Sequence, residues 1–193
     1  MSPLRRVGLA ALVATVVLAG AACGSDDDGG ATSGRAPAVF ADPPEGANSI
    51  GVCRSFDTAT IKEQVGGGSN FRRLAPTAIG KAGDAVTGES CSWERQDPGG
   101  AFRTLTITVR NFGADAAALG DAFESRTSSL VDAEELPGLG DAAVTSASAE
   151  ATEVFVNQGP YELQVASRAG EGLDPLPVET LVFLATAGLE VLP

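Results

Sequence analysis

The residues best suited to acid–base chemistry in this sequence lie in the segment "VDAEELPGLGD", residues 131–141. They are the carboxylates Asp132, Glu134, Glu135 and Asp141. Two carboxylates on either side of a sugar–sugar bond are sufficient for glycan hydrolysis, so this cluster is a candidate hydrolase site. A solvated helix end followed by a turn explains the same composition, and we favour that interpretation.

Other catalytic chemistries find little support, because the 193 residues include no histidine. Histidine is the usual general base, a member of the Ser-His-Asp and Cys-His nucleophile systems, and the commonest metal ligand. The acidic run "GSDDDGG" lacks the spacing and closing Glu of a calcium loop, and "AIGKAGDAVTG" lacks the phosphate-loop pattern. We therefore expect no catalytic residues, no metal and no cofactor.

The first 22 residues have the three-part pattern of an export signal. Arg5 and Arg6 form a basic start, residues 7–18 are apolar, and small residues precede Cys23. The apolar run is shorter than the ~20 residues that a spanning helix needs, so we favour a cleaved signal over an uncleaved anchor. We also favour the general secretory route over the twin-arginine route.

Three cysteines are present: Cys23 at the signal boundary, and Cys53 and Cys91 in the body of the chain. Exported domains lie in an oxidising compartment, so we expect Cys53 and Cys91 to pair and Cys23 to be left over. A disulfide closing this loop is worth ~4 kcal/mol by a chain-entropy estimate. No C-x-x-C pair suggests a redox role.

Composition divides the remaining chain into a tether and one domain. Residues 23–48 are rich in Gly, Ala, Ser, Asp and Pro and have few large apolar side chains, which predicts a flexible acidic tether. Residues 49–193 are predicted to form a single globular domain. The net charge of −12 disfavours nucleic acid and anionic headgroups as direct ligands.

Hydrophobic periodicity and turn residues predict an α+β fold with one antiparallel β-sheet and helices packed on it. The expected elements are a helix over 57–65 with Asp57 as N-cap, strands over 90–96 and 101–112, a helix within 114–131, a strand within 135–148, a hairpin of 152–158 and 161–167, and a last helix starting near Asp174. That last helix is apolar on most sides, including Phe183, so we expect it to be buried.

Strand alternation identifies candidate contact residues. In strand 101–112, we expect Leu105, Ile107 and Val109 to face the core and Thr104, Thr106 and Thr108 to face solvent or a partner. Trp93 shares a face with Cys91, so packing on the disulfide is favoured over stacking on a ligand. The set Tyr161, Leu163 and Val165 is expected to face inward.

The chain resembles the actinobacterial lipoproteins of the domain-of-unknown-function family 3558. The resemblance rests on the order of "LAGAACGS", the acidic tether, "IGVCRSFDTATI", "CSW", "ELPGLGDAAV", "VNQGPYELQV" and "ETLVFLATAGLEVLP". It implies that Cys23 carries a lipid and that Cys53 and Cys91 form a disulfide. It implies an α/β/α sandwich similar to Mog1/PsbP-type domains, and it brings no catalytic residues.

These features lead to three functional hypotheses. The first is a lipid-anchored, non-enzymatic binding or sensor domain on the outer face of the cytoplasmic membrane, with Trp93, Thr104, Thr106 and Thr108 as candidate ligand contacts. Its partners would be the membrane, through Cys23, and an envelope protein or small ligand. The second is a structural or adaptor lipoprotein of an envelope complex. The third, which we favour least, is the carboxylate-dependent glycan hydrolase.

Overall fold

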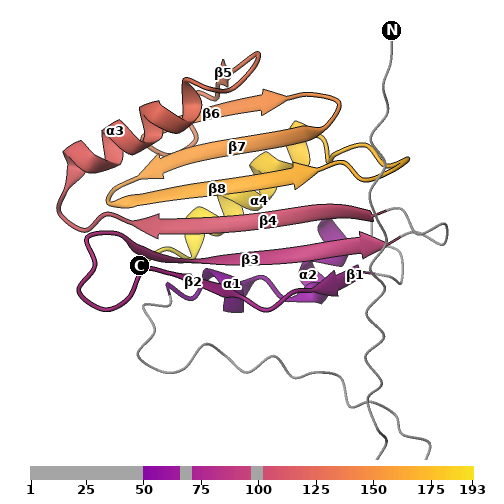
Figure 1. Ribbon diagram of the computed structural model, residues 1–193, viewed down its shortest axis with the longest axis horizontal. Coiled ribbons are helices and arrows are strands. Elements are labelled where there is room, and N and C mark those ends of the chain that lie inside the picture. Colours follow the sequence, from indigo (N-terminus) through magenta and orange to yellow (C-terminus); the bar gives the residue numbers. More distant parts are fainter. Residues whose placement is uncertain (1–49, 66–70, 97–101) are drawn as a thin grey trace, which may run out of the picture. The chain divides into compact units, whose positions relative to one another are not determined.

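A computed structural model describes residues 50–65, 71–96 and 102–193 (Figure 1). The predictions for residues 1–48, including the signal, Cys23 and the tether, lie outside the described residues. Within these ranges the chain forms an eight-stranded antiparallel sheet and four helices. The predicted α+β fold, an antiparallel sheet packed with helices, is confirmed.

The sheet is built mainly from strands that follow one another through short turns. The strands are β1 (Phe71–Arg73), β2 (Thr77–Ile79), β3 (Thr87–Gln96), β4 (Phe102–Asn111), β5 (Glu134–Glu135), β6 (Ala142–Ala147), β7 (Ala151–Gln158) and β8 (Tyr161–Arg168). Their order across the sheet is β1-β3-β4-β8-β7-β6-β5, and β2 also pairs with β3. The predicted hairpin is β7–β8, which turns at Gly159 and Pro160. The short strands β1, β2 and β5 were not expected from the sequence.

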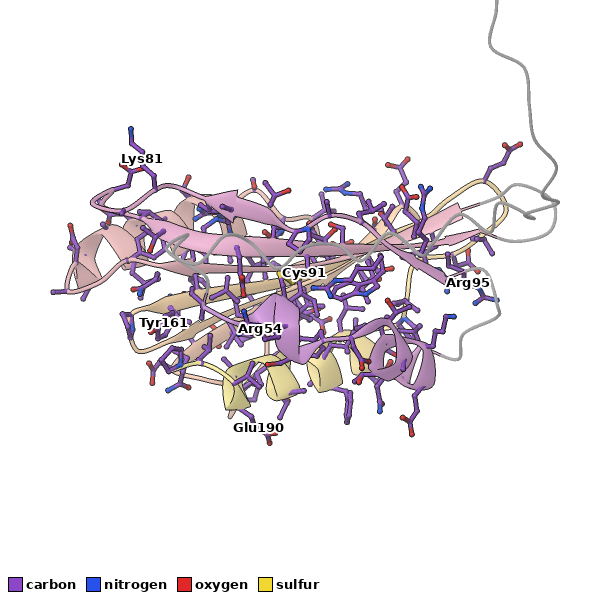
Figure 2. The ribbon with its side chains drawn as sticks, turned by 90° about the horizontal axis from the view of Figure 1, so that it is seen from below. Arg54, Lys81, Cys91, Arg95, Tyr161 and Glu190 are labelled. Atoms are coloured by element: carbon purple, nitrogen blue, oxygen red, sulfur yellow. A yellow bond between two sulfur atoms is a disulfide. The ribbon has the colours of Figure 1, made fainter. Side chains whose placement is uncertain are left out.

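The helices lie on both faces of this sheet, but they cover the faces unequally. They are α1 (Val52–Ser55), α2 (Thr58–Gln64), α3 (Ala116–Thr127) and α4 (Val178–Glu190). Helices α1, α2 and α4 lie on one face, which we call the inner face; in Figure 2, Arg54 of α1 and Glu190 of α4 are on the same side of the sheet. Helix α3 packs on the opposite, outer face, against β7 and β8 (Figure 1).

Strand alternation places the main core between the inner face and the three helices. Leu105, Ile107 and Val109 of β4 are buried as predicted. The strands and helices also contribute Trp93, Val154, Val156, Leu163, Val165, Ile61, Leu181 and Leu184 to the same cluster. Burying each of these large side chains stabilises the fold by about 1.5–3 kcal/mol, so this layer is the main source of stability.

The prediction for the last helix was wrong in two respects. The helix begins at Val178 rather than near Asp174, because Pro177 is the N-cap with an extended backbone (ψ 157°), and a proline disfavours the helical conformation in the residue before it. The helix is also not buried on most sides: Leu181, Leu184 and Ala185 face the sheet, whereas Phe183 is 49% exposed. At 100° per residue, position 183 lies on nearly the opposite side from position 181.

Helix α2 begins as the sequence predicts. The carboxylate of Asp57 accepts a hydrogen bond of 2.7 Å from the backbone N–H of Thr60. This bond, with a further contribution from the Thr60 side chain, lowers the pKa of Asp57 below its ordinary value of 3.8. A carboxyl whose pKa is lower in the folded state stabilises the fold above the unfolded-state pKa, and that stabilisation is lost as the pH falls through the folded-state pKa.

Substituting Asp57 should therefore separate the capping bond from the charge. Asp57→Ala should lower the free energy of unfolding at pH 7 by about 1 kcal/mol, whereas Asp57→Asn should retain most of the cap. The stability difference between wild type and Asp57→Asn should decrease between pH 5 and pH 2, because only the wild type then loses its charge. Urea denaturation at several pH values measures both effects; a difference that does not change with pH would contradict the charge contribution.

Candidate functional site

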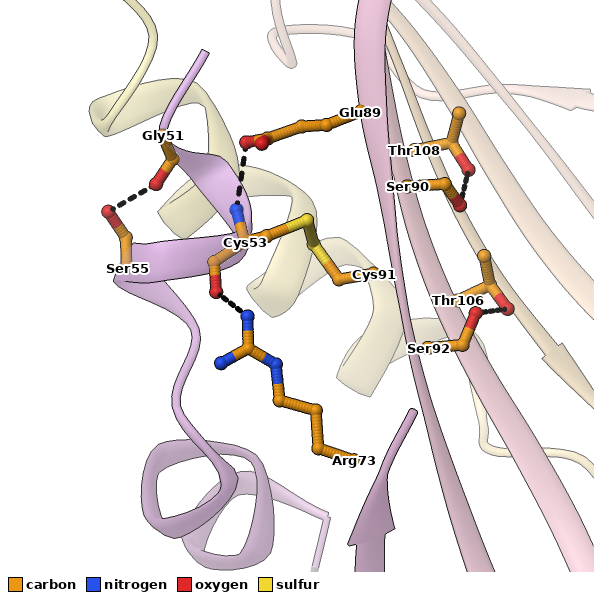
Figure 3. The surroundings of a disulfide bond; sticks show 10 residues. All are labelled: Gly51, Cys53, Ser55, Arg73, Glu89, Ser90, Cys91, Ser92, Thr106 and Thr108. Atoms are coloured by element: carbon orange, nitrogen blue, oxygen red, sulfur yellow. Dashed lines mark hydrogen bonds between the residues drawn. A yellow bond between two sulfur atoms is a disulfide. The ribbon is translucent and has the colours of Figure 1, made fainter. Parts of the chain in front are cut away.

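The cysteines of the body form the predicted disulfide. Cys53 of α1 is bonded to Cys91 of β3, with Cα atoms 5.4 Å apart (Figure 3). The backbone N–H of Cys53 donates to the buried carboxylate of Glu89 at 3.0 Å. The carbonyl of Cys53 accepts a hydrogen bond from the guanidinium of Arg73. Two charged side chains and a covalent bond thus attach α1 to the sheet, which indicates a structural role for this cysteine pair.

Trp93 lies in the same core. Its side chain is fully buried on the inner face, in one cluster with Cys53 and Cys91. Its indole nitrogen has no hydrogen-bond partner among the described residues. An indole without exposed surface has no face on which a ligand can stack in this conformation.

The predicted threonine row lies on the outer face, opposite serines of β3. Ser90 and Thr108 share a hydrogen bond of 2.9 Å, and Ser92 and Thr106 share one of 3.0 Å (Figure 3). Thr108 is buried, and Thr104 and Thr106 are half-buried. The hydroxyl groups of Thr106 and Thr108 therefore share hydrogen bonds with serine hydroxyl groups of the neighbouring strand β3. A ligand-contact role for this row stays a prediction.

The four candidate carboxylates are all exposed, but they do not form one cluster. Glu134 and Glu135 form the two-residue strand β5 instead of the expected helix end, because they pair with Thr145 and Val144 of β6. Adjacent side chains of a strand point to opposite faces, so these two glutamates diverge. Glu135 and Asp141 line a common hollow. Asp141 also accepts a hydrogen bond of 2.7 Å from the backbone N–H of Gly159.

Two hollows lie on either side of the loop Leu136–Gly140, which joins β5 to β6. The first, which we call the β6 hollow, has a volume of about 300 Å³; it lies between this loop, β6 and Phe123 of α3. The second, the α4 hollow, has a volume of about 500 Å³ and lies between the loop, the β7–β8 turn and the end of α4. Both volumes fall within the range of small-ligand sites.

The hollows share part of their lining, and their charges have one sign. Gly138, Leu139 and Gly140 line both. The apolar part of the lining includes Phe123, Leu136, Pro137, Leu139, Val144, Pro160, Tyr161, Leu189 and Leu192. The charged side chains among the described lining residues are Glu135, Asp141 and Glu190. This region therefore suits an apolar ligand that also carries positive charge or hydrogen-bond donors.

Sequence reasoning identified the carboxylates of this region but not the hollows. The composition of residues 136–140 indicates a turn, whereas the position of this loop depends on contacts with distant segments, such as Asn157 of β7 beside Gly140. The sequence signal is "LPGLG", in which one proline and one glycine separate two leucines and a second glycine follows. Because glycine and proline have no long side chains, the neighbouring residues of such a loop do not cover its leucines.

Within residues 50–65, 71–96 and 102–193, no group of three or more metal-ligating side chains comes together. Among the helices of those same ranges, none combines the length and the apolar character required to cross a bilayer.

No family model, curated protein or solved structure matches the chain. The family resemblance therefore rests on the sequence motifs alone.

Gly140 positions this loop, and its substitution is a direct test of the geometry. Its φ is +62°, and a Cβ there would lie 2.4 Å from the Asn157 carbonyl oxygen and 2.5 Å from Val156 Cγ1. Gly140→Ala should lower the free energy of unfolding by about 1–3 kcal/mol, because both the dihedral angle and the carbonyl oppose a side chain.

Gly120 is the matched control, since an added Cβ would meet no atom within 4 Å. Gly120→Ala lies within α3 and should stabilise the domain by up to about 1 kcal/mol. Thermal and urea denaturation measure both variants. Equal stabilities for the two variants would show that the loop does not hold Gly140 in this conformation.

Proposed function

We propose that this chain is an exported, lipid-anchored protein of the cell envelope, and that its domain from residue 49 is a non-enzymatic binding or sensor domain. The observation that carries the binding function is the pair of hollows around Leu136–Gly140, with shared apolar lining and acidic charge. The proposed occupant is an apolar segment of an envelope protein that carries basic side chains. Positive charge in the occupant complements the acidic lining.

The proposed location is supported by three features. The first 22 residues have the pattern of an export signal, and Cys23 follows a run of small residues. The disulfide between Cys53 and Cys91 is of the kind that persists in oxidising compartments. The acidic, Gly- and Pro-rich segment 23–48 supplies a tether between an anchor and the domain. The anchor is proposed to place the domain on the outer face of the cytoplasmic membrane.

The anchor is tested by labelling with radioactive palmitate in a bacterial host that processes lipoproteins. We expect the full chain to incorporate label and to sediment with membranes, and Cys23→Ala to lose both properties. Ser25→Ala, two residues further along, should behave as the wild type. If Cys23→Ala incorporates as much label as the wild type, the lipid is attached at another position, and the assignment to Cys23 is refuted.

The binding site is tested with a synthetic peptide of alternating leucine and lysine as the probe, and its leucine–glutamate counterpart as the negative ligand. We expect the basic peptide to bind, as measured by fluorescence anisotropy, and the double variant Glu135→Gln/Glu190→Gln to weaken binding about tenfold, the loss of ~1.4 kcal/mol. Leu139→Ala should also weaken binding, because Leu139 lines both hollows.

Two controls separate the hollows from the general negative charge of the domain. Glu150→Gln/Glu171→Gln removes the same charge from exposed positions outside both hollows, and Val131→Ala truncates an apolar residue that is 69% exposed. Neither should change the affinity by more than twofold. Equal weakening by both glutamate double variants would show that attraction is non-specific and would overturn the site.

A glycan hydrolase is the alternative from another class, and one observation bears on it. Of the four candidate carboxylates, Glu135 and Asp141 line a common hollow and would have to act together. The carboxylate of Asp141 accepts a hydrogen bond from the β7–β8 turn, so this residue has a structural role in the fold. An adaptor lipoprotein would use the same surface as the proposed binding domain, so the peptide experiment applies to both.

A further inference from the structure

A second cluster of charged residues lies on the outer face of the sheet, apart from the residues that line the hollows. Arg110 of β4 and Glu162 of β8 are directly opposite each other in register. Arg110 Nη1 donates to Glu162 Oε1 at 2.7 Å, and Arg126 Nη1 of α3 donates to Glu162 Oε2 at 3.0 Å. One carboxylate therefore holds two guanidinium groups from different elements.

The charges of this cluster do not balance. The side chain of Glu162 is 0% exposed, whereas those of Arg110 and Arg126 are 20% and 32% exposed. A buried carboxylate requires a partner, and one arginine in bidentate geometry would meet that need. The second arginine adds an unbalanced positive charge on a domain whose chain is strongly acidic.

The proximity of the two arginines has an electrostatic cost. Burial lowers the pKa of the Arg110 guanidinium, and the positive charge of Arg126 lowers this pKa further, while Glu162 acts in the opposite direction. Because a guanidinium group is a permanent cation in proteins, two of them close together repel each other. A bound anion would relieve that repulsion.

Both arginines also have N–H donors that form no hydrogen bond within the described residues. Arg110 bonds to Glu162, and Arg126 bonds to Glu162 and to the carbonyl of Ala122, and the described residues provide no other acceptors for them. Each guanidinium carries five N–H donors. None of their nitrogens is among the buried atoms without a partner, so the remaining donors are open to solvent. Donors in this arrangement match the oxygen pairs of a carboxylate or phosphate.

We propose that Arg110 and Arg126 form a binding site for a small oxyanion, of the carboxylate or phosphate type, on the outer face of the sheet next to α3. Glu162 is the positioning residue: it orients both guanidinium groups and leaves one net positive charge for the ligand. Neither arginine is among the residues that line the hollows around Leu136–Gly140.

The probes are inorganic phosphate and acetate, titrated separately into the isotope-labelled domain. We expect saturable shifts of the Arg110 and Arg126 Nε–H signals in nuclear magnetic resonance spectra. Arg126→Gln should weaken binding at least about tenfold, since it removes half of the donors. It leaves Glu162 paired with Arg110, so the fold should be retained. The anion with the lower dissociation constant identifies the ligand type.

Arg72→Gln is the matched control, because Arg72 forms a one-to-one pair with Glu94 at 2.6 Å and its side chain is 71% exposed. Its affinity for either anion should equal that of the wild type. Arg126→Lys provides a second variant that keeps the charge but not the planar donor pair, and it should bind with intermediate affinity. Shifts that do not saturate, or equal losses in Arg72→Gln and Arg126→Gln, would overturn the proposal.

Discussion

The pairing of β3 with β4 is the constraint on which most of this structure depends. The two strands pair over their full length, with Cys91 opposite Ile107 and Trp93 opposite Leu105. Because side chains of a strand alternate, a shift of one residue in either strand would exchange its inner and outer sets. Such a shift would place Cys91 on the outer face, away from Cys53 in α1. The disulfide, the core and the serine–threonine pairs thus depend on one register.

The same register explains why the two faces have different chemistry. On the inner face the sheet meets α1, α2 and α4, and apolar side chains are buried together. On the outer face, β3 and β4 pair serines with threonines, whose hydroxyl groups satisfy one another. Hydrogen bonds of this kind contribute only about 0.5–1.5 kcal/mol each, so the outer face adds less to stability than the inner face. Glu162 is buried on this outer face because Arg110 and Arg126 pair with its carboxylate.

Features that depend on neighbouring residues in the sequence could be predicted, and features that depend on distant ones could not. Asp57 followed by a short apolar pattern predicted α2, and the alternation from Thr104 to Val109 predicted the faces of β4. Strands β1 and β2 have three residues each and form only because β3 offers them an edge. Glu162 lies between two inward residues, so its position in the strand indicates an outward, solvated side chain. It is buried because Arg126 of α3 packs against it and donates a hydrogen bond to its carboxylate. The α4 hollow likewise requires the β7–β8 turn and the end of α4 to meet the Leu136–Gly140 loop, and the β6 hollow requires Phe123 of α3 beside this loop.

Helix α3 links the two regions for which we propose binding. Phe123 lines the β6 hollow, and Arg126, less than one turn further along, bonds to Glu162. These two side chains project from neighbouring positions of the same helix, because residues three apart share a face. Leu119 is the buried residue of α3, and Arg126 adds an ion pair from this helix to Glu162 of β8. A displacement of α3 would consequently alter the wall of the β6 hollow and the spacing of the two arginines at the same time.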